Sequence, residues 1–418
     1  MEFAPACRIK VEKLINKGVH IPNPLTLDIG DEVDIERISG TDVTIYPGCR
    51  IYGKKTVISR GVRIGAEGPV TIDNCQLGTE VELKAGYFRK AVFLEKASMA
   101  LGAHVREGCI LEEEASGAHC VGLKHTILFP FVTLGSLINF CDCLMAGGTS
   151  RKDHSEVGSS YIHFNYSPDG DKTTPSLIGD VPRGVMLNEH PIFLGGQGGM
   201  VGPLRLGYGC VVVAGTILRS DVLEDDRLIV GKSHRGKVVA HVPHRYMGLS
   251  HIVRNNIIYC ANLVALDQWY RYVRGRFFAE QELGTLVYDG ALENLALARE
   301  ERIRRLRDMA GKMSASLDLS SPNSAAARQK REFMDRIDEV SNQLADGRWA
   351  DAGKEDRERF LTALEEDHRQ RSGDGYIRAV KGLPAEVART GTEWLQTIVD
   401  ACCAGAAEVL PSLHLFGA

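Results

Sequence analysis

The chain has 418 residues, of which 44% are hydrophobic and 25% charged, and its formal net charge at pH 7 is -4. These proportions are typical of a globular protein with room for more than one domain. The slightly acidic balance gives no general attraction to nucleic acid or to an anionic membrane, so we expect neither as a partner.

Two further observations concern location and cysteine chemistry. The first residues contain no apolar core of the kind found in secretion signals, and no later segment reaches 18 consecutive apolar residues. We therefore expect a cytoplasmic protein whose eleven cysteines are reduced thiols. Cys141 and Cys143, with His119 and His125 upstream, lack the pair spacing of zinc ligands, so no metal site is expected.

Residues 1–24 are predicted to form a short helical cap. Val11, Leu14 and Ile15 recur at helical spacing, and Pro22 and Pro24 end the pattern.

Residues 25–238 form a long series of short β-rich runs broken by Gly, Asp and Asn. Ile45, Ile51 and Val57 step by six residues, which is typical of the hexapeptide repeats of a parallel β-helix. One aliphatic side chain per strand would point inward, and small residues would allow the corners. A small β-sandwich is the alternative for a region rich in Val and Gly. Other aliphatic–Gly pairs also lie multiples of six apart: Leu77 with Leu101, and Leu206 with Val230.

Residues 239–418 are predicted to form a helical domain. Apolar and aromatic residues recur every three or four positions from Ile257 to Tyr270. The basic run Arg299–Arg307 is interleaved with glutamates, so we interpret it as a solvated helix face. We assign this domain to assembly or regulation. A linker is expected near 314–324, with further helices near 325–344, 355–371 and 386–410.

A polar loop at residues 161–180 interrupts the repeats and is the candidate site. His154 and His163 lie beside or within it, among many other polar side chains. A solvated loop is the alternative interpretation, since the same residue types favour turns for backbone reasons.

The order of motifs in this loop resembles that of one enzyme family. Asn165-Tyr166, Asp169-Gly170, Lys172 and Ile178-Gly179-Asp180 are similar to elements of the acetyltransferase domain of bifunctional N-acetylglucosamine-1-phosphate uridylyltransferases/glucosamine-1-phosphate acetyltransferases. The similarity covers roughly residues 120–235. It implies a left-handed β-helix that forms a homotrimer, with acetyl-CoA as co-substrate and a sugar phosphate or nucleotide sugar as partner. The uridylyltransferase half is expected to be absent, because no Gly-rich nucleotide loop follows a strand.

The resemblance also implies residue roles. Asn165 and Tyr166 would contact substrate, Lys172 would hold the sugar phosphate, and Ala214 and Lys232 would lie near the CoA groove. His190 follows one coil later and is a further candidate for substrate binding.

Acetyl transfer also needs a base, and here the sequence departs from the family. The position of the family's catalytic histidine, counted back 23 residues from Asn165, is Asp142. We therefore predict His163 or His154 as the base. The leading hypothesis is an acetyl-CoA-dependent N- or O-acyltransferase. The alternative is a non-catalytic β-helix scaffold or sugar-nucleotide-binding protein that uses its helical domain for assembly.

Overall fold

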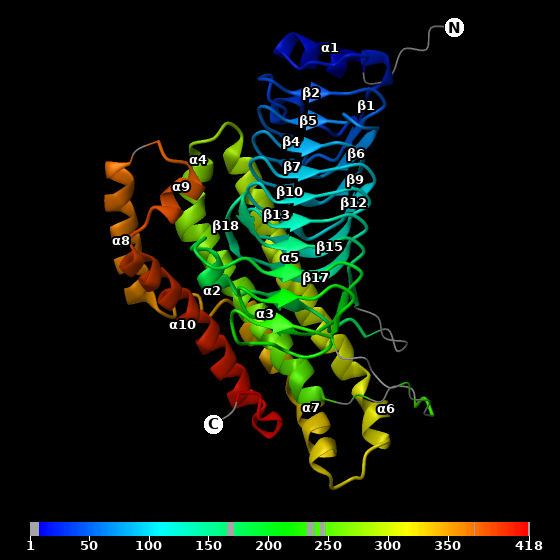
Figure 1. Cartoon of the computed structure of the whole chain (residues 1–418), viewed down its shortest axis with the longest axis vertical. Coiled ribbons are helices and arrows are strands. Elements are labelled where there is room, and N and C mark those ends of the chain that lie inside the picture. The colour runs from blue at the N-terminus through cyan, green and yellow to red at the C-terminus, as the bar shows by residue number, and fades with distance from the viewer. Residues whose placement is uncertain are drawn as a thin grey trace.

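The computed structural model describes residues 8–416, apart from 165–170, 232–235, 237, 239, 243–245, 247 and 372. A column of triangular coils begins beneath a short helix, and a set of longer helices runs along one side of the column (Figure 1). The predicted fold class, a left-handed parallel β-helix followed by a helical C-terminal region, is confirmed, with about 11 turns in the solenoid. The initial helix is α1 (Arg8–Lys17).

Successive coils contribute separate short strands to three faces, which we call A, B and C. Face A is a parallel sheet of β2 (Thr44–Ile45), β5 (Arg63–Ile64), β8 (Glu82–Leu83), β11 (Ser98–Met99), β14 (Ser116–Gly117), β16 (Thr133–Leu134), β20 (Glu156–Val157), β23 (Phe193–Leu194), β26 (Val211–Val212) and β28 (Leu228–Ile229). Face B contains β1 (Asp28–Ile29), β3 (Arg50–Tyr52), β6 (Val70–Asp73), β9 (Gly86–Arg89), β12 (Ala103–Val105), β21 (Ile162–Phe164), β24 (Gly199–Val201) and β27 (Ile217–Leu218). Face C contains β4 (Val57–Ile58), β7 (Gln76–Leu77), β10 (Ala91–Phe93), β13 (Cys109–Leu111), β22 (Ser176–Ile178) and β25 (Arg205–Leu206).

Two longer strands join face B to face C. They are β15 (Gly122–Leu128) and β17 (Asn139–Met145), whose first halves pair with face B and whose second halves pair with face C. The coils after β17 carry insertions: the antiparallel hairpin of β18 (Gly148–Ser150) and β19 (Asp153–His154), and the short helix α2 (Val181–Gly184).

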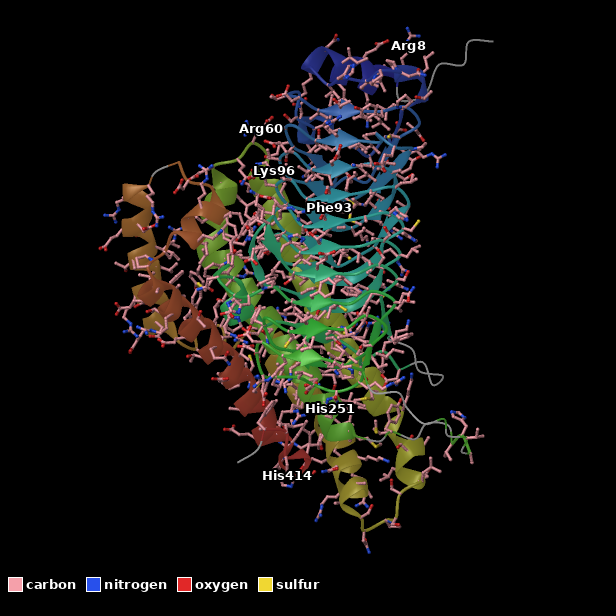
Figure 2. The ribbon with its side chains drawn as sticks, in the orientation of Figure 1. Arg8, Arg60, Phe93, Lys96, His251 and His414 are labelled. Atoms are coloured by element: carbon pink, nitrogen blue, oxygen red, sulfur yellow. The ribbon has the colours of Figure 1, made fainter. Side chains whose placement is uncertain are left out.

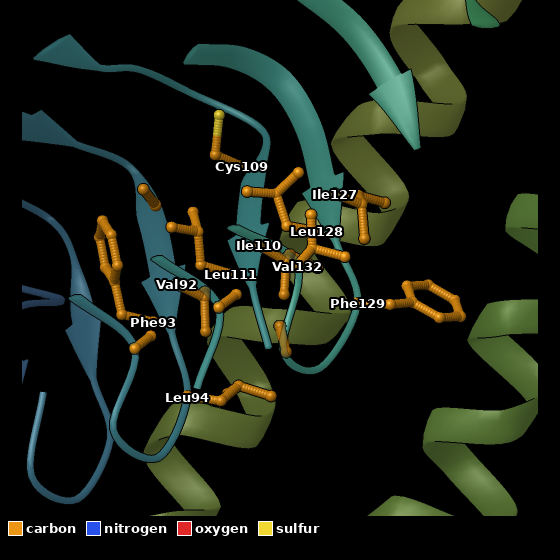
Figure 3. Packing of buried hydrophobic residues seen from close by; sticks show 14 of the residues in the cluster. Val92, Phe93, Leu94, Cys109, Ile110, Leu111, Ile127, Leu128, Phe129 and Val132 are labelled. Atoms are coloured by element: carbon orange, nitrogen blue, oxygen red, sulfur yellow. The ribbon is translucent and has the colours of Figure 1, made fainter. Parts of the chain in front are cut away.

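The six-residue step places successive aliphatic side chains on successive faces. Ile45, Ile51 and Val57 lie on faces A, B and C, and all three are fully buried. Figure 3 shows part of the buried core, in which Val92 and Ile110 on face C stack from coil to coil. The predicted repeat is correct, but not every chosen residue faces the coil interior. Val57 is in register with Gln76, whose side chain lies against Gly290 in the helical region, and Leu101 and Val230 are 50% and 65% exposed.

Burial in this core predicts a measurable cost for removing one methyl group. Ile110→Val should lower the free energy of unfolding by about 0.5–1.5 kcal/mol, because the residue is fully buried on β13. Urea unfolding followed by far-UV circular dichroism measures this change. The matched control is Ile217→Val on β27, which is 44% exposed and should stay within about 0.5 kcal/mol of the parent chain.

The helical region packs against face C. Helix α5 contacts β7, β10 and β13, α3 contacts β22, and α10 packs outside on α3 and α8. The helices are α3 (Leu249–Trp269), a π-helical turn (Tyr270–Arg274), α4 (Gly275–Ala279), α5 (Gly284–Gly311), α6 (Met313–Asp318), α7 (Ala325–Ala345), α8 (Lys354–Gln370), α9 (Tyr376–Lys381) and α10 (Ala385–Val409). The segment 314–324, expected as a linker, includes most of α6 and the turn before α7.

Buried polar side chains join these helices to the coils. The Asn294 side-chain oxygen accepts a hydrogen bond from the Gly108 amide at 3.1 Å, and that of Asn262 accepts one from the Val181 amide at 2.9 Å. The Asn256 side chain donates to the Thr173 carbonyl at 3.0 Å. Such buried hydrogen bonds fix the register of the helices on face C, because leaving any of these groups unpaired is costly.

A buried charged triad lies at the upper end of this joint. Arg274 is 1% exposed and pairs with Glu112 at 3.5 Å and Glu113 at 2.5 Å, while the Tyr270 hydroxyl donates to Glu112 at 2.6 Å. Beside the triad is a cleft of about 780 Å³, lined by Glu113 among others. Arg60 and Lys96, labelled in Figure 2, lie on its coil side.

Candidate functional site

The corner between faces B and C gathers polar groups from successive coils. Lys124 pairs with Cys141 and Thr126 with Cys143, so His125 and Asp142 occupy the same corner one coil apart. Both have positive φ, 45° and 61°, which lets β15 and β17 turn the corner without breaking the ladder. Gly108 occupies this corner one coil earlier, where a Cβ would lie 2.3 Å from His125 Nδ1.

Asp142 is held by a helix rather than facing solvent. Its carboxylate lies 2.7 Å from Arg302 Nη2 on α5, and the two side chains are 5% and 2% exposed. Arg302 Nη1 also donates to the Lys172 carbonyl at 3.1 Å. Asp142, where the resemblance predicted a catalytic histidine, is therefore a buried, ion-paired carboxylate.

His163 lies inside the coil. It is 2% exposed on β21, and its Nε2 is 2.9 Å from the Ser176 hydroxyl on β22. Burial lowers the pKa of His163 to about 4, so the ring is neutral at pH 7. In this position the imidazole links face B to face C across the interior, and it has little open surface for a ligand.

His154 and His190 lie away from that corner. His154 is half-buried in the β18–β19 hairpin, and its Nδ1 has no hydrogen-bond partner among the residues that the structure describes. His190 is exposed, and its Nδ1 lies 2.8 Å from Asp226. The hydrogen bond with Asp226 raises the pKa of His190. The structure does not bring these two histidines together with His163.

Of the other site residues predicted from the sequence, the structure describes only Lys172 and Ala214. Lys172 is exposed, and its backbone is anchored by Arg302. Ala214 is exposed just after β26, at the corner between faces A and B. Asn165, Tyr166 and Lys232 lie outside the described residues.

Two residues of this corner were not predicted as site residues. His125 lies 17 residues before Asp142, which is one coil. The repeat spacing could therefore have predicted that the two residues share a corner. Arg302 lies on α5, outside the repeats, so the repeat pattern does not predict which coil it contacts. No sequence signal connects it with Asp142.

No group of three or more His, Cys, Asp or Glu side chains in the described part of the chain has the arrangement of a metal site. Among the described helices, none combines the length and apolar character needed to cross a bilayer.

Comparison with known proteins gives a consistent but partial match. No protein-family model matches the sequence. The chain is 30% identical over 217 residues to the bifunctional protein GlmU of Thermotoga maritima, which covers 51% of this chain and 42% of that protein. It is 29% identical over 225 residues to GlmU of Fervidobacterium nodosum, and 27% identical over 217 residues to GlmU of Carboxydothermus hydrogenoformans. The chain thus spans less than half the length of these relatives, and its β-solenoid is consistent with a GlmU acetyltransferase-like domain.

Proposed function

We propose that the chain is an acyltransferase that moves an acetyl group from acetyl-CoA to an amino or hydroxyl group of a sugar phosphate or nucleotide sugar. The observation that carries this proposal is the corner of faces B and C, in a fold like that of the GlmU relatives. His125 and Asp142 lie there one coil apart, and Arg302 links Asp142 to the Lys172 backbone.

Face B supplies a surface for the acyl donor. Ala214 lies at the edge of face B that adjoins face A, three coils further along the column than Asp142. The three steps follow the register pairs Asn139–Ile162, Ile162–Gly199 and Gly199–Ile217. At the usual strand spacing these steps span about 14 Å along the column. Exposed Ile162 and Ile217 would contact the pantetheine arm, with the thioester directed toward the corner.

The chemistry needs a base at this corner. A neutral acceptor nitrogen or oxygen attacks the thioester carbonyl, its proton passes to the base, the carbon–sulfur bond breaks and CoA leaves as the thiol after protonation. Backbone N–H groups at coil corners would stabilise the oxyanion formed in the attack.

In a homotrimer, copies of the chain would contact one another through faces A and B. The resemblance implies a homotrimer, and face C is covered by α3 and α5 of the same chain. Face A carries a free apolar ladder near the end of the column, in which Phe193, Val211 and Leu228 are in register and 39–69% exposed.

The direct test uses the full chain with acetyl-CoA and glucosamine 1-phosphate. Mass spectrometry should detect an acetylated sugar and an equal amount of free CoA. This readout is preferable to a thiol reagent, which would also react with the exposed Cys120. Isothermal titration should detect CoA binding below millimolar concentration. No binding and no product would exclude the enzyme.

A specific observation favours the alternative function, a non-catalytic β-helix that binds sugar nucleotides. Asp142, where the family has its catalytic histidine, is neutralised by Arg302 and closed off by α5. A scaffold of this kind should bind the ligand without turnover, and substitution of His154 and His163 should leave that binding unchanged.

A further inference from the structure

The cleft of about 780 Å³ beside the buried triad lies between the coils and the helical region. Its coil side is the corner of faces C and A, where residues at equivalent positions of successive coils form a column. In each step the amide after one column residue donates to the carbonyl of the residue before it, at 2.8–3.0 Å. The column consists of Thr41, Arg60, Thr79, Glu95 and Glu113. Its four coil steps make the cleft about 19 Å long at the usual strand spacing.

The opposite wall comes from two helical segments. Phe277 lies on α4, residues 280–282 follow that helix, and residues 373–378 lead into α9. Phe277 and Tyr376 pack edge to face with their ring centroids 5.5 Å apart, and they are 4% and 6% exposed. The Ser39 hydroxyl, two residues before Thr41, joins the walls by donating to Glu282 at 2.9 Å. The cleft is therefore long, with an aromatic strip on its helical side.

The lining of this cleft is acidic. Among the described residues that line it, six are acidic and three are basic. The acidic residues are Glu95, Glu113, Glu114, Glu280, Glu282 and Asp374, and the basic ones are Arg60, Lys96 and Arg378. An excess of negative charge between walls of low dielectric concentrates cations, so the cleft suits a positively charged ligand.

Glu113 gives an independent indication of such a ligand. Its side chain is only 10% exposed, and Arg274 pairs with its Oε1 at 2.5 Å. Its Oε2 has no hydrogen-bond partner among the residues that the structure describes. Buried carboxylate oxygens are normally satisfied by a donor, because leaving one unpaired is costly. Since Glu113 borders the cleft, a ligand in the cleft can supply that donor.

We propose that the cleft binds a linear polyamine, with one ammonium group on Glu113 Oε2 and a second on Glu95. These two carboxylates lie one coil apart, about 5 Å along the column, a span comparable to that of three or four methylene groups. The methylene chain would pack on Phe277 and Tyr376. A metal ion fits less well, because the described residues hold no group with the arrangement of a metal site. The bound polyamine would join the coils to α4 and α9, and this role does not depend on acyl transfer.

The first test is isothermal titration of the full chain with spermidine, a linear triamine, at low ionic strength and pH 8. This pH favours the ionised form of Glu113, whose pKa is raised by burial. We expect one spermidine per chain with a Kd below about 1 mM. Glu113→Gln should weaken binding by at least about tenfold, because an ammonium group loses a charge-assisted contact. No binding by the parent chain would overturn the proposal.

A second pair of variants avoids the buried triad. Glu95 and Glu67 are both 40% exposed, and each pairs with a lysine, at 3.1 and 3.3 Å. Glu67 lies at the corner of faces A and B, outside the cleft lining. Glu95→Lys should weaken spermidine binding by at least about tenfold, because repulsion replaces attraction at the column. Glu67→Lys changes the net charge equally and should leave the Kd within twofold of the parent value.

Titration with Mg²⁺ at matched ionic strength separates a polyamine site from general attraction of cations. Spermidine should bind at least about tenfold more tightly than Mg²⁺, because only the amine can use both carboxylates and the aromatic strip. Equal binding of the two cations, or equal weakening by Glu95→Lys and Glu67→Lys, would overturn the proposal. These titrations need neither acetyl-CoA nor a sugar, so their outcome stands apart from that of the acyltransferase assay.

Discussion

Arg302→Met should lower the free energy of unfolding by about 3–5 kcal/mol, because it leaves Asp142 charged and buried without its partner. Methionine keeps much of the packing volume, so the loss reflects charge rather than a cavity. The Lys172 carbonyl also loses its donor, so the sugar KM should rise in the same variant. Urea unfolding followed by tryptophan fluorescence measures the loss, since all three tryptophans lie in the helical region that α5 belongs to.

Two variants show whether the buried charge is the cause. Arg302→Met combined with Asp142→Asn should recover part of the lost stability, because the uncompensated carboxylate is gone. Arg304→Met is the matched control on the same helix: Arg304 is 56% exposed and pairs with Glu301, so its loss should cost less than about 1 kcal/mol. If Arg302→Met and Arg304→Met were equally stable, the pair with Asp142 would not hold α5 on the coils.

The repeat pattern was enough to predict the coils, because the inward side of each strand obeys one simple spacing. Phe93, Met99, Val105 and Leu111 are six residues apart, lie on faces C, A, B and C in turn, and are all fully buried. Leu101 failed as an inward residue for a physical reason: it lies at a corner, two positions beyond Met99, where the side chain meets solvent.

The site was less predictable, because it depends on which histidine a corner exposes and on what a distant helix covers. His163 and His125 are both histidines near one corner, but the strand alternation turns the first inward, and the left-handed corner conformation leaves the second half-exposed. The ion pair of Asp142 joins residues 160 positions apart. No local pattern encodes such a contact, since it arises only when α5 docks on face C.

Stability should fall as pH rises from about 5 to 7, owing to the triad of Glu112, Glu113 and Arg274. Burial raises the pKa of Glu112 to about 7 and also raises that of Glu113, although Arg274 opposes both shifts. A carboxyl whose pKa is raised in the folded state binds its proton more tightly there than in the unfolded chain. Its contribution is therefore complete below about pH 4.3 and disappears as pH rises through about 7, by at most about 1.4 kcal/mol per pH unit for one group.

Glu112→Gln tests this origin. Glutamine keeps an oxygen for the Tyr270 hydroxyl but does not titrate, so the slope of stability between pH 5 and 7 should become flatter in urea unfolding. Glu114→Gln, on the neighbouring half-buried residue outside the triad, is the control and should keep the parent slope. A parent chain whose stability rises over this interval would contradict the prediction.

Arg274→Met gives the complementary result. The substitution leaves two buried carboxylates near each other without the cation. It also removes the contact between the guanidinium and the Tyr376 ring, whose centroid is 3.9 Å away. The free energy of unfolding should fall by about 3–5 kcal/mol at pH 8. The loss should shrink toward pH 5, because both carboxylates then take up protons and no longer need the arginine. A loss independent of pH would mean that Arg274 stabilises the joint through packing on Tyr270, Phe278 and Tyr376 rather than through its charge.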